Sequence, residues 1–353
     1  MYPRIEIKLD NIIENVKSIK ALCTERGVKL SVVTKLLSGD IELVEKLVEN
    51  GADCICESRI KNFKKYKNIK AEKWLIRIPM ISEAEDVVRY ADASLNSEIK
   101  VIKALDKEAE KQGKVHKVIL MYELGDLREG CMRDEIEDVL VKSLKLKNIE
   151  VYGIGVNLSC YGEIVPSERN MKELATLVNE LEEKYNIKFK IVSGGNSSSY
   201  KMLKNGKLPS EINNLRMGEA VFLGNVPCFE EPIKELNRNN FILKAEIIEL
   251  KEKPSIPWGK RGNANSFGEE ISFKDNGIRK RAIVGLGKQD VRIECINPKD
   301  EDIVLLDGSS DHIILDVTDS KKEYKVGDII EFEMNYAGIL TANTSEYVER
   351  IIV

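Results

Sequence analysis

The feature that most constrains the fold is a repeated alternation of short apolar runs with longer amphipathic segments over about the first 220 residues. The runs predicted as strands cover residues 30–34, 54–57, 74–78, 93–95, 118–122, 151–156, 189–192 and 215–222. The segments between them carry apolar residues at helical spacing, and several begin with Ser or Asp. Eight such alternations predict an α/β fold, a (β/α)8 TIM-type barrel. The rival, a doubly wound open sheet, usually has a glycine-rich turn after its first strand, and this chain has none there.

The pattern changes near residue 237, after which short strand-like runs follow one another between Gly, Asp, Asn and Pro, with no convincing helix among them. The sequence therefore predicts two domains, a barrel over residues 1–236 and a C-terminal all-β domain over residues 237–353. A chain of 353 residues with 42% hydrophobic residues is large enough to fill two cores.

Composition excludes several classes of protein. A formal net charge of −4 gives no basic field for nucleic acid or for an anionic membrane surface. The N-terminus has no apolar signal segment, and no apolar run is long enough to cross a bilayer. The seven cysteines are scattered and lack CxxC spacing, so they predict neither a disulfide framework nor a zinc site. We therefore expect a cytoplasmic protein with no nucleic-acid, membrane or metal partner.

A lysine ends the first predicted barrel strand, in the stretch "SVVTKLLSGD". Active sites of such barrels lie at the carboxyl ends of the strands, where Lys35 is placed. Because burying an ammonium group is costly, this lysine either reaches solvent, pairs with a carboxylate, or has a lowered pKa and attacks a carbonyl. Position alone favours a lysine that reaches solvent or pairs with a carboxylate.

Residues at other strand ends favour the third alternative, a lysine of lowered pKa that attacks a carbonyl. The seventh strand is followed by Asn196, Ser197 and two further serines at a helix start, which offer hydroxyls and backbone N–H groups to an anion. The eighth carries Arg216 and then Gly218, where the backbone can approach a ligand closely. A lysine, an anion cradle and an arginine on one rim are the set that pyridoxal 5'-phosphate needs.

These motifs resemble the alanine racemase family of fold-type III pyridoxal-phosphate enzymes, most closely its ornithine racemase branch. The resemblance extends over nearly the whole chain, from "RIEIKLDNIIENV" through "GNSSS" and "LRMGEAVFLG" to "EFEMNYAGIL". It implies that Lys35 binds the cofactor, that Asn196 and Ser197 bind its phosphate together with backbone near Gly218, and that Arg216 faces the pyridine nitrogen.

The resemblance also implies residues that contact the substrate. In "MYELGDLREG", Arg128 supports the substrate carboxylate, and in "GSSDHIILDV", Asp311 belongs to the carboxylate-contacting loop. Tyr336 in "EFEMNYAGIL" is implied as a phosphate contact. Family members form head-to-tail homodimers, so the β-domain of one subunit completes the active site of the other.

Several positions depart from the family pattern. Met121 stands where alanine racemases carry a modified lysine, so no carbamate is expected, and Gly39 replaces a tyrosine phosphate contact. The region that normally supplies a second acid/base tyrosine, residues 253–270, contains no tyrosine. Trp258 lies there and cannot carry a proton, whereas His312 can.

The function expected from these residues is racemisation of an amino acid, with ornithine favoured and lysine, alanine or another amino acid as alternatives. A cationic side chain needs a nearby carboxylate, for which Glu123, Glu219, Asp290 and Asp311 are the candidates. The same architecture also hosts decarboxylases of basic amino acids and D-threonine aldolases, and the barrel alone can form a non-catalytic pyridoxal-phosphate carrier. The second domain, with Asp311 and Tyr336, argues against a carrier.

Overall fold

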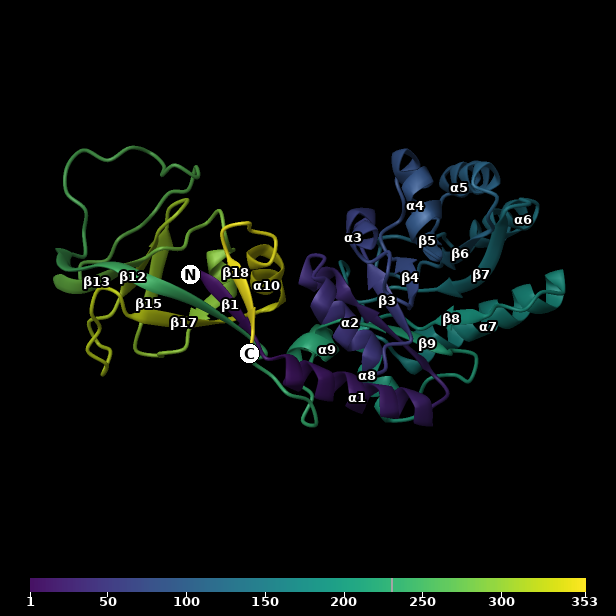
Figure 1. Cartoon of the computed structure of the whole chain (residues 1–353), viewed down its shortest axis with the longest axis horizontal. Helices are drawn as coiled ribbons and strands as arrows, with labels where there is room; N and C mark the ends of the chain where they lie inside the picture. Colours follow the sequence, from purple (N-terminus) through teal and green to yellow (C-terminus); the bar gives the residue numbers. More distant parts are fainter. Residues whose placement is uncertain (230) are drawn as a thin grey trace. The chain divides into compact units, whose positions relative to one another are not determined.

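The fold consists of two compact units. A computed structural model describes residues 1–229 and 231–353. One unit is Asp10–Arg238, and the other combines Asn239–Val353 with Met1–Leu9 (Figure 1).

The larger unit is a closed barrel of eight parallel strands, which confirms the predicted fold class. Each expected run forms or overlaps one strand, because each is a short apolar segment buried on both faces, as parallel strands require. The barrel strands are β2 (Lys29–Val33), β3 (Cys54–Glu57), β4 (Glu72–Leu75), β5 (Ala93–Asn96), β6 (His116–Met121), β7 (Ile149–Gly155), β8 (Ile191–Ser193) and β9 (Asn214–Met217).

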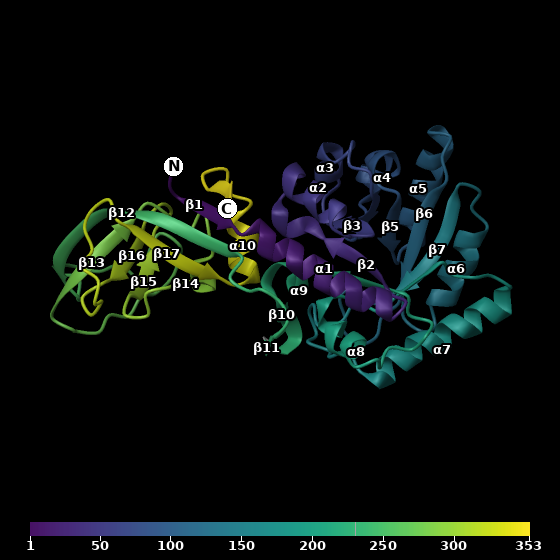
Figure 2. The ribbon, with the colours of Figure 1, turned by 60° about the horizontal axis from the view of Figure 1, so that its bottom comes forward.

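Helices lie outside the ring of strands, as Figures 1 and 2 show for α2 to α7. Local sequence sets where they begin: the Asp40 side chain accepts a hydrogen bond from the Leu43 amide at 3.1 Å, and Ser167 forms a capping box with Asn170. The helices of this unit are α1 (Leu9–Glu25), α2 (Ile41–Glu49), α3 (Ile60–Lys65), α4 (Ala84–Tyr90), α5 (Ile99–Lys111), α6 (Ile136–Leu144), α7 (Glu168–Tyr185), α8 (Tyr200–Lys204) and α9 (Glu219–Leu223).

A cluster of apolar side chains forms a core of the barrel unit. It is made of Val33, Cys54, Cys56, Trp74, Ala93, Leu95, Ile119, Met121, Tyr152 and Ile191. Buried polar side chains of β2, β8 and β9 are hydrogen-bonded to one another: Ser193 donates to Asn214 at 2.7 Å, and Asn214 donates to Ser31 at 2.8 Å. These buried polar groups satisfy one another, so this part of the barrel can support a charged side chain.

The smaller unit is built on a mainly antiparallel sheet with the path β14-β17-β12-β13-β16-β15. Its longest strand, β12, pairs with β17 along its first part and mainly with β13 along the rest (Figure 2). The strands are β1 (Arg4–Ile7), β12 (Phe241–Pro254), β13 (Ile278–Val284), β14 (Ile296–Pro298), β15 (Val304–Gly308), β16 (Ile313–Asp316), β17 (Ile329–Met334) and β18 (Glu349–Ile352).

Three features differ from the sequence-based expectations. The expected barrel over 1–236 includes the first strand, but β1 pairs with β12 and β18 and so belongs to the β unit. A helix, α10 (Tyr336–Ala342), forms where none was expected, because Asn335 caps it by accepting from the Gly338 amide at 3.0 Å. The expected strand 215–222 ends early, since Gly218 begins the turn into α9.

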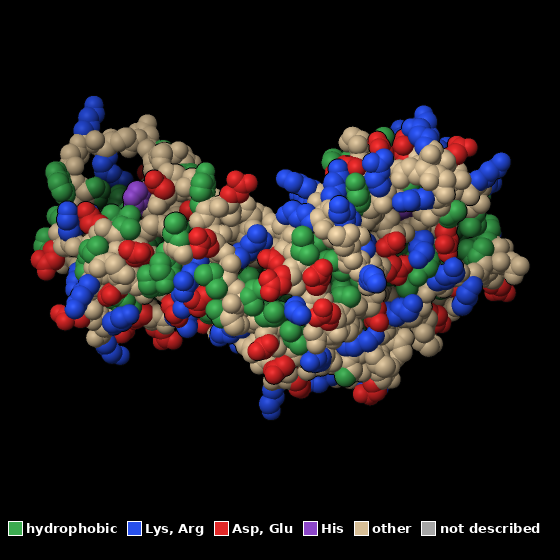
Figure 3. Space-filling model, in the orientation of Figure 1, with side chains coloured by type: hydrophobic (Ala, Val, Ile, Leu, Met, Phe, Trp, Pro, Cys, Tyr) green, Lys and Arg blue, Asp and Glu red, His purple; other side chains and the backbone are tan. Residues whose placement is uncertain are grey.

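No helix in the described part of the chain is long and apolar enough to cross a membrane. Lysine and arginine side chains are interspersed with aspartate and glutamate on the face drawn in Figure 3. That face therefore shows no large field of one sign.

The two tryptophans provide a matched test of this packing. Trp74 is 1% exposed and packs edge-on against Tyr152, with ring centroids 6.4 Å apart, whereas Trp258 is 85% exposed. We expect Trp74→Ala to lower the free energy of unfolding by about 3–5 kcal/mol, because it leaves a cavity in the core. In the monomeric chain, at protein concentrations too low for self-association, Trp258→Ala should change it by less than about 0.5 kcal/mol. Urea denaturation followed by circular dichroism measures both, and equal effects would contradict this account of the core.

Candidate active site

Lys35 lies on a short 3-10 turn, Thr34–Leu37, that directly follows β2. The residue that closes the turn, Ser38, adopts a left-handed conformation with φ of 52°, so the chain reverses sharply here. Burial lowers the pKa of the Lys35 ammonium, and the positive charge of Arg128 lowers it further. A larger fraction of this amine is therefore neutral and able to react with a carbonyl or accept a proton.

A buried carboxyl group anchors the turn that carries Lys35. Glu57, at the end of β3, is fully buried and accepts hydrogen bonds from the Thr34 hydroxyl at 3.1 Å and the Asn62 amide at 3.1 Å. The backbone N–H of Ser58 also donates to it, at 3.2 Å. Burial raises the pKa of Glu57 to about 7, although these donors oppose the shift. Sequence analysis missed Glu57, whose only signal was its place at a strand end.

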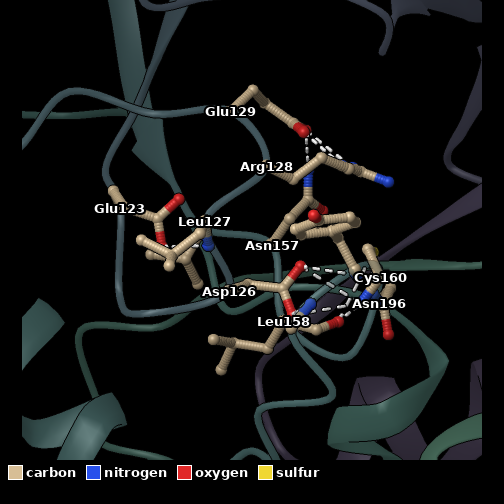
Figure 4. Close-up of polar contacts among 12 residues, drawn as sticks. Glu123, Asp126, Leu127, Arg128, Glu129, Asn157, Leu158, Cys160 and Asn196 are labelled. Carbon is tan, nitrogen blue, oxygen red and sulfur yellow. Dashed lines mark hydrogen bonds and ion pairs between the residues drawn. The ribbon is translucent and has the colours of Figure 1, made fainter.

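The predicted anion cradle lies after β8. Asn196 accepts from the Ser198 amide at 2.8 Å. It also donates to the Leu158 carbonyl at 2.8 Å (Figure 4). The Ser197 hydroxyl accepts from the backbone N–H groups of Gly218 at 3.2 Å and Ala220 at 3.1 Å, which joins the segments that follow β8 and β9. These groups form one polar cluster at the carboxyl ends of two neighbouring strands.

Two details of this cluster were not evident from sequence. The Ser198 hydroxyl oxygen is buried and has no hydrogen-bond partner within the described residues, which is unusual for a hydroxyl. A Cβ atom at Gly218 would lie 3.1 Å from Cβ of Val33, so glycine permits close approach to β2. The expected reason for glycine was close approach to a ligand, whereas the approach seen is to a neighbouring strand.

Arg216 lies within the barrel end and is 2% exposed. Its guanidinium donates to the Val156 carbonyl at 2.8 Å, to the Asn157 side-chain oxygen at 2.5 Å, and to the Ser193 hydroxyl. Burial lowers the pKa of Arg216, but a guanidinium remains charged at any physiological pH. Gly155 makes room for it, because a Cβ there would lie 3.3 Å from Nη1.

The loop after β6 carries Arg128 and Glu129, which form a two-pronged ion pair with Nη2 and Oε1 2.7 Å apart (Figure 4). Glu129 also accepts from the side-chain amide of Asn157, the residue that contacts Arg216. Sequence analysis identified Arg128 but missed Glu129 and Asn157.

Two carboxylates hold the backbone of the loops around Arg128. Asp126 is buried and accepts from the N–H groups of residues 160, 161 and 162, at 3.1 to 3.2 Å (Figure 4). Glu123, a candidate for binding a substrate amine, accepts from the amides of Gly125 at 2.6 Å and Leu127 at 3.0 Å. The Glu123 carboxylate is thus hydrogen-bonded to the backbone of its own loop.

The remaining predicted residues belong to the β unit. Asp311 is largely exposed, and hydrogen bonds from His312 and Ser310 lower its pKa. Tyr336 is the first residue of α10. Asp290 is buried and accepts from the Gly287 amide at 3.1 Å and the Ser345 hydroxyl at 2.9 Å, so its role there is structural.

The donor set of the barrel suits a ligand with several negative charges. Lys35, Arg128 and Arg216 all follow or end barrel strands, and their charges act on one another. The unpartnered Ser198 hydroxyl beside the Asn196 and Ser197 cluster leaves a donor for a phosphate oxygen. Pyridoxal phosphate, with one aldehyde, one phosphate and one ring nitrogen, fits these residues. No group of residues able to hold a metal ion occurs in the described part of the chain.

The raised pKa of Glu57 predicts a distinctive pH dependence of stability. Its ordinary pKa is 4.5 and its pKa in the folded protein is about 7, so between these values the folded chain holds a proton that the unfolded chain has lost. The free energy of unfolding should therefore fall as pH rises across this window, by on the order of 3 kcal/mol from this group. Glu57→Gln removes this component, so the stability difference between variant and wild type should shift in the variant's favour from pH 5 to pH 8. A difference independent of pH, in urea titrations at both values, would contradict the assignment.

Comparison with known proteins gives matches over the whole chain. The family model "Alanine racemase, N-terminal domain" matches residues 7–226. An ornithine racemase of Acetoanaerobium sticklandii is 46% identical over 351 residues, covering 99% of each chain. A lysine racemase of Thermotoga maritima is 39% identical over 353 residues, covering 99% of this chain and 98% of its own.

Solved structures share the fold at lower identity. An alanine racemase of Clostridium difficile 630 superimposes with a TM-score of 0.77 at 19% identity, covering 99% of this chain and 95% of its own. An alanine racemase of Bartonella henselae with covalently bound pyridoxal phosphate gives 0.74 at 17% identity, covering 99% of both chains. These neighbours confirm the barrel with a β-domain, and the family model and the two racemases show that the chain belongs to the alanine racemase family.

Proposed function

We propose that this protein is a pyridoxal-phosphate-dependent racemase that interconverts L- and D-ornithine. The observation that carries the proposal is Lys35, a lysine of lowered pKa on a barrel rim that also holds the polar cluster of Asn196 and Ser197 and two arginines. The full-length similarity to an ornithine racemase supports this substrate. The lysine racemase makes lysine the second candidate, since the two substrates differ by one methylene.

Lys35 is the group that attaches the cofactor and then moves the proton. Bound pyridoxal phosphate supplies an electron-withdrawing ring that makes the Cα–H of an attached amino acid more acidic. The Lys35 amine takes or returns this proton on one face of Cα, and its lowered pKa increases the neutral fraction that can accept it.

Arg216, Asn196 and Ser197 would orient the cofactor. With pyridoxal phosphate bound, the permanently charged guanidinium of Arg216 would disfavour protonation of the ring nitrogen and so would limit electron withdrawal by the ring. The hydrogen bonds of Arg216 to Val156 and Asn157 hold it in one orientation. Asn196, Ser197 and the backbone near Gly218 would bind the phosphate.

Arg128 would bind the substrate carboxylate. Of the four carboxylates proposed for the side-chain amine, Glu123 and Asp290 serve backbone and hydroxyl groups of their own units. Glu219, the first residue of α9, therefore remains the candidate in the barrel unit, and Asp311, whose Oδ1 accepts from Ser310 and bonds with His312, is the candidate in the β unit. His312, which is 2.8 Å from Asp311, can carry a proton for the opposite face of Cα.

The active protein would be a homodimer in which the β unit of one subunit supplies Tyr336 and Asp311 to the barrel of the other. Apolar side chains exposed on the segment between β12 and β13, at Ile256, Trp258 and Phe267, support a surface that a second copy covers. We place the protein in the cytoplasm, in keeping with seven cysteines that are all unpaired.

The reaction can be tested directly with the protein loaded with pyridoxal phosphate in D2O. L-ornithine should lose optical activity and take up deuterium at Cα, and L-lysine should react more slowly. Lys35→Ala should reduce exchange by on the order of 10³-fold or more, because the proton carrier is lost. Exchange of no amino acid by the loaded wild type would refute the racemase, and release of CO2 or an aldehyde would indicate a decarboxylase or an aldolase.

A complementation experiment tests the shared active site. Lys35→Ala and the double variant Asp311→Ala/Tyr336→Ala should each be inactive alone. If sites are shared, mixing and reassociation produce heterodimers in which one of the two sites is intact, and activity should recover to about a quarter of the wild-type value. No recovery, with mixed dimers verified by native mass spectrometry, would contradict sharing.

A further inference from the structure

Three cationic side chains gather around the barrel rim, and their mutual repulsion has to be balanced. Arg128 lowers the pKa of both Lys35 and Arg216, while the charge of Glu129 raises both. Glu129 is therefore the carboxylate that acts on all three cations, through direct contact with Arg128 and through its field on the others.

The contact between Glu129 and Arg128 is well placed to fix the guanidinium. Nε and Nη2 of Arg128 each donate to one carboxylate oxygen of Glu129, a two-pronged geometry that restricts rotation of both planes (Figure 4). The Glu129 side chain is 16% exposed, against 40% for Arg128, so solvent screens the carboxylate only in part.

Asn157 extends this contact to Arg216. Its side-chain oxygen accepts from Nη2 of Arg216 at 2.5 Å, so its NH2 group points the other way and donates to Glu129. The amide therefore has one permitted orientation, since a flipped amide would face each charged group with the wrong atom. Arg216 otherwise contacts the neutral Ser193 hydroxyl and Val156 carbonyl.

No other side chain considered on the segment from Met121 to Glu129 can take the place of the Glu129 carboxylate. Met121, at the end of β6, is fully buried and apolar, and Asp126 uses its oxygens on the backbone of residues 160–162. Glu123 likewise serves its own loop.

We propose that Glu129 is a positioning residue that fixes the orientation of two guanidinium groups. It acts on Arg128 by direct contact and on Arg216 through Asn157. The inference rests on the proposed function, in which Arg128 binds the substrate carboxylate and Arg216 faces the cofactor. Glu129 touches neither ligand in this scheme, and it acts on affinity for the carboxylate by fixing the Arg128 side chain.

The test compares two ligands that lack one recognition group each and cannot be racemised. 5-Aminopentanoate keeps the carboxylate and the distal amine of ornithine, whereas 1,4-diaminobutane keeps both amines and lacks the carboxylate. In Glu129→Gln holoenzyme we expect the affinity for 5-aminopentanoate to fall about 10- to 100-fold, as on loss of one charged hydrogen-bond network. The affinity for 1,4-diaminobutane should change less than about 2-fold. Calorimetry measures both, and in kinetics KM for L-ornithine should rise more than kcat falls.

Glu180→Gln is the matched control, because it removes a carboxylate from the exposed Arg133–Glu180 ion pair close to the same segment. It should leave both affinities unchanged. Glu129→Asp keeps the charge on a shorter side chain and should show a smaller loss of affinity, for 5-aminopentanoate only. This variant also keeps the test valid if Glu129→Gln fails to fold.

Equal losses for both ligands, or a Glu129→Gln variant that behaves as Glu180→Gln does, would overturn the positioning role. Failure of the proposed function is seen separately, because wild-type holoenzyme would then racemise neither ornithine nor lysine, whatever the binding results.

Discussion

Closure of eight parallel strands into a barrel is the constraint on which the rest of the site depends. Closure brings β9 beside β2, so residues 183 positions apart, Ser31 and Asn214, are hydrogen-bonded in the barrel wall. The same closure places the turn of Lys35, the Ser197 cluster and Arg216 at the carboxyl ends of neighbouring strands. These groups are distant in sequence, so local structure alone cannot bring them together. The chemistry proposed for this protein requires them to be close to one another.

Electrostatics then determines what this rim can bind. Burial makes the positive charges of Lys35 and Arg216 costly, and hydrogen bonds to neutral acceptors compensate only in part. A ligand carrying a phosphate and a carboxylate would relieve that cost, which is a physical reason for such a site to bind pyridoxal phosphate and an amino acid. Glu129 pairs directly with Arg128 and acts on Lys35 and Arg216 through its charge, so it offsets part of their mutual repulsion.

Much of the fold could be predicted, because each barrel strand is a short apolar run that needs no distant partner to be recognised. The run at 54–57 forms β3 with the expected ends, whereas the run at 30–34 ends one residue early, so Lys35 lies on a short turn just after β2. Strand β1 was assigned to the wrong unit, because its alternation shows that it is a strand but not which sheet it joins. The helix α10 was missed, since its seven residues carry little periodicity and depend on the Asn335 cap.

The sequence by itself determined the architecture of the barrel and the identities of Lys35, Asn196, Ser197 and Arg216 as candidates, because strand ends and turn residues are local signals, and the family resemblance added Arg128. Only the tertiary structure showed the roles of Glu57, Glu129 and Asn157. These side chains act through contacts with residues distant in sequence, such as Asn157 with Arg216. A polar residue in isolation has no pattern that distinguishes it from a solvated one, and burial, which raises the pKa of Glu57 to about 7, exists only once the chain has folded.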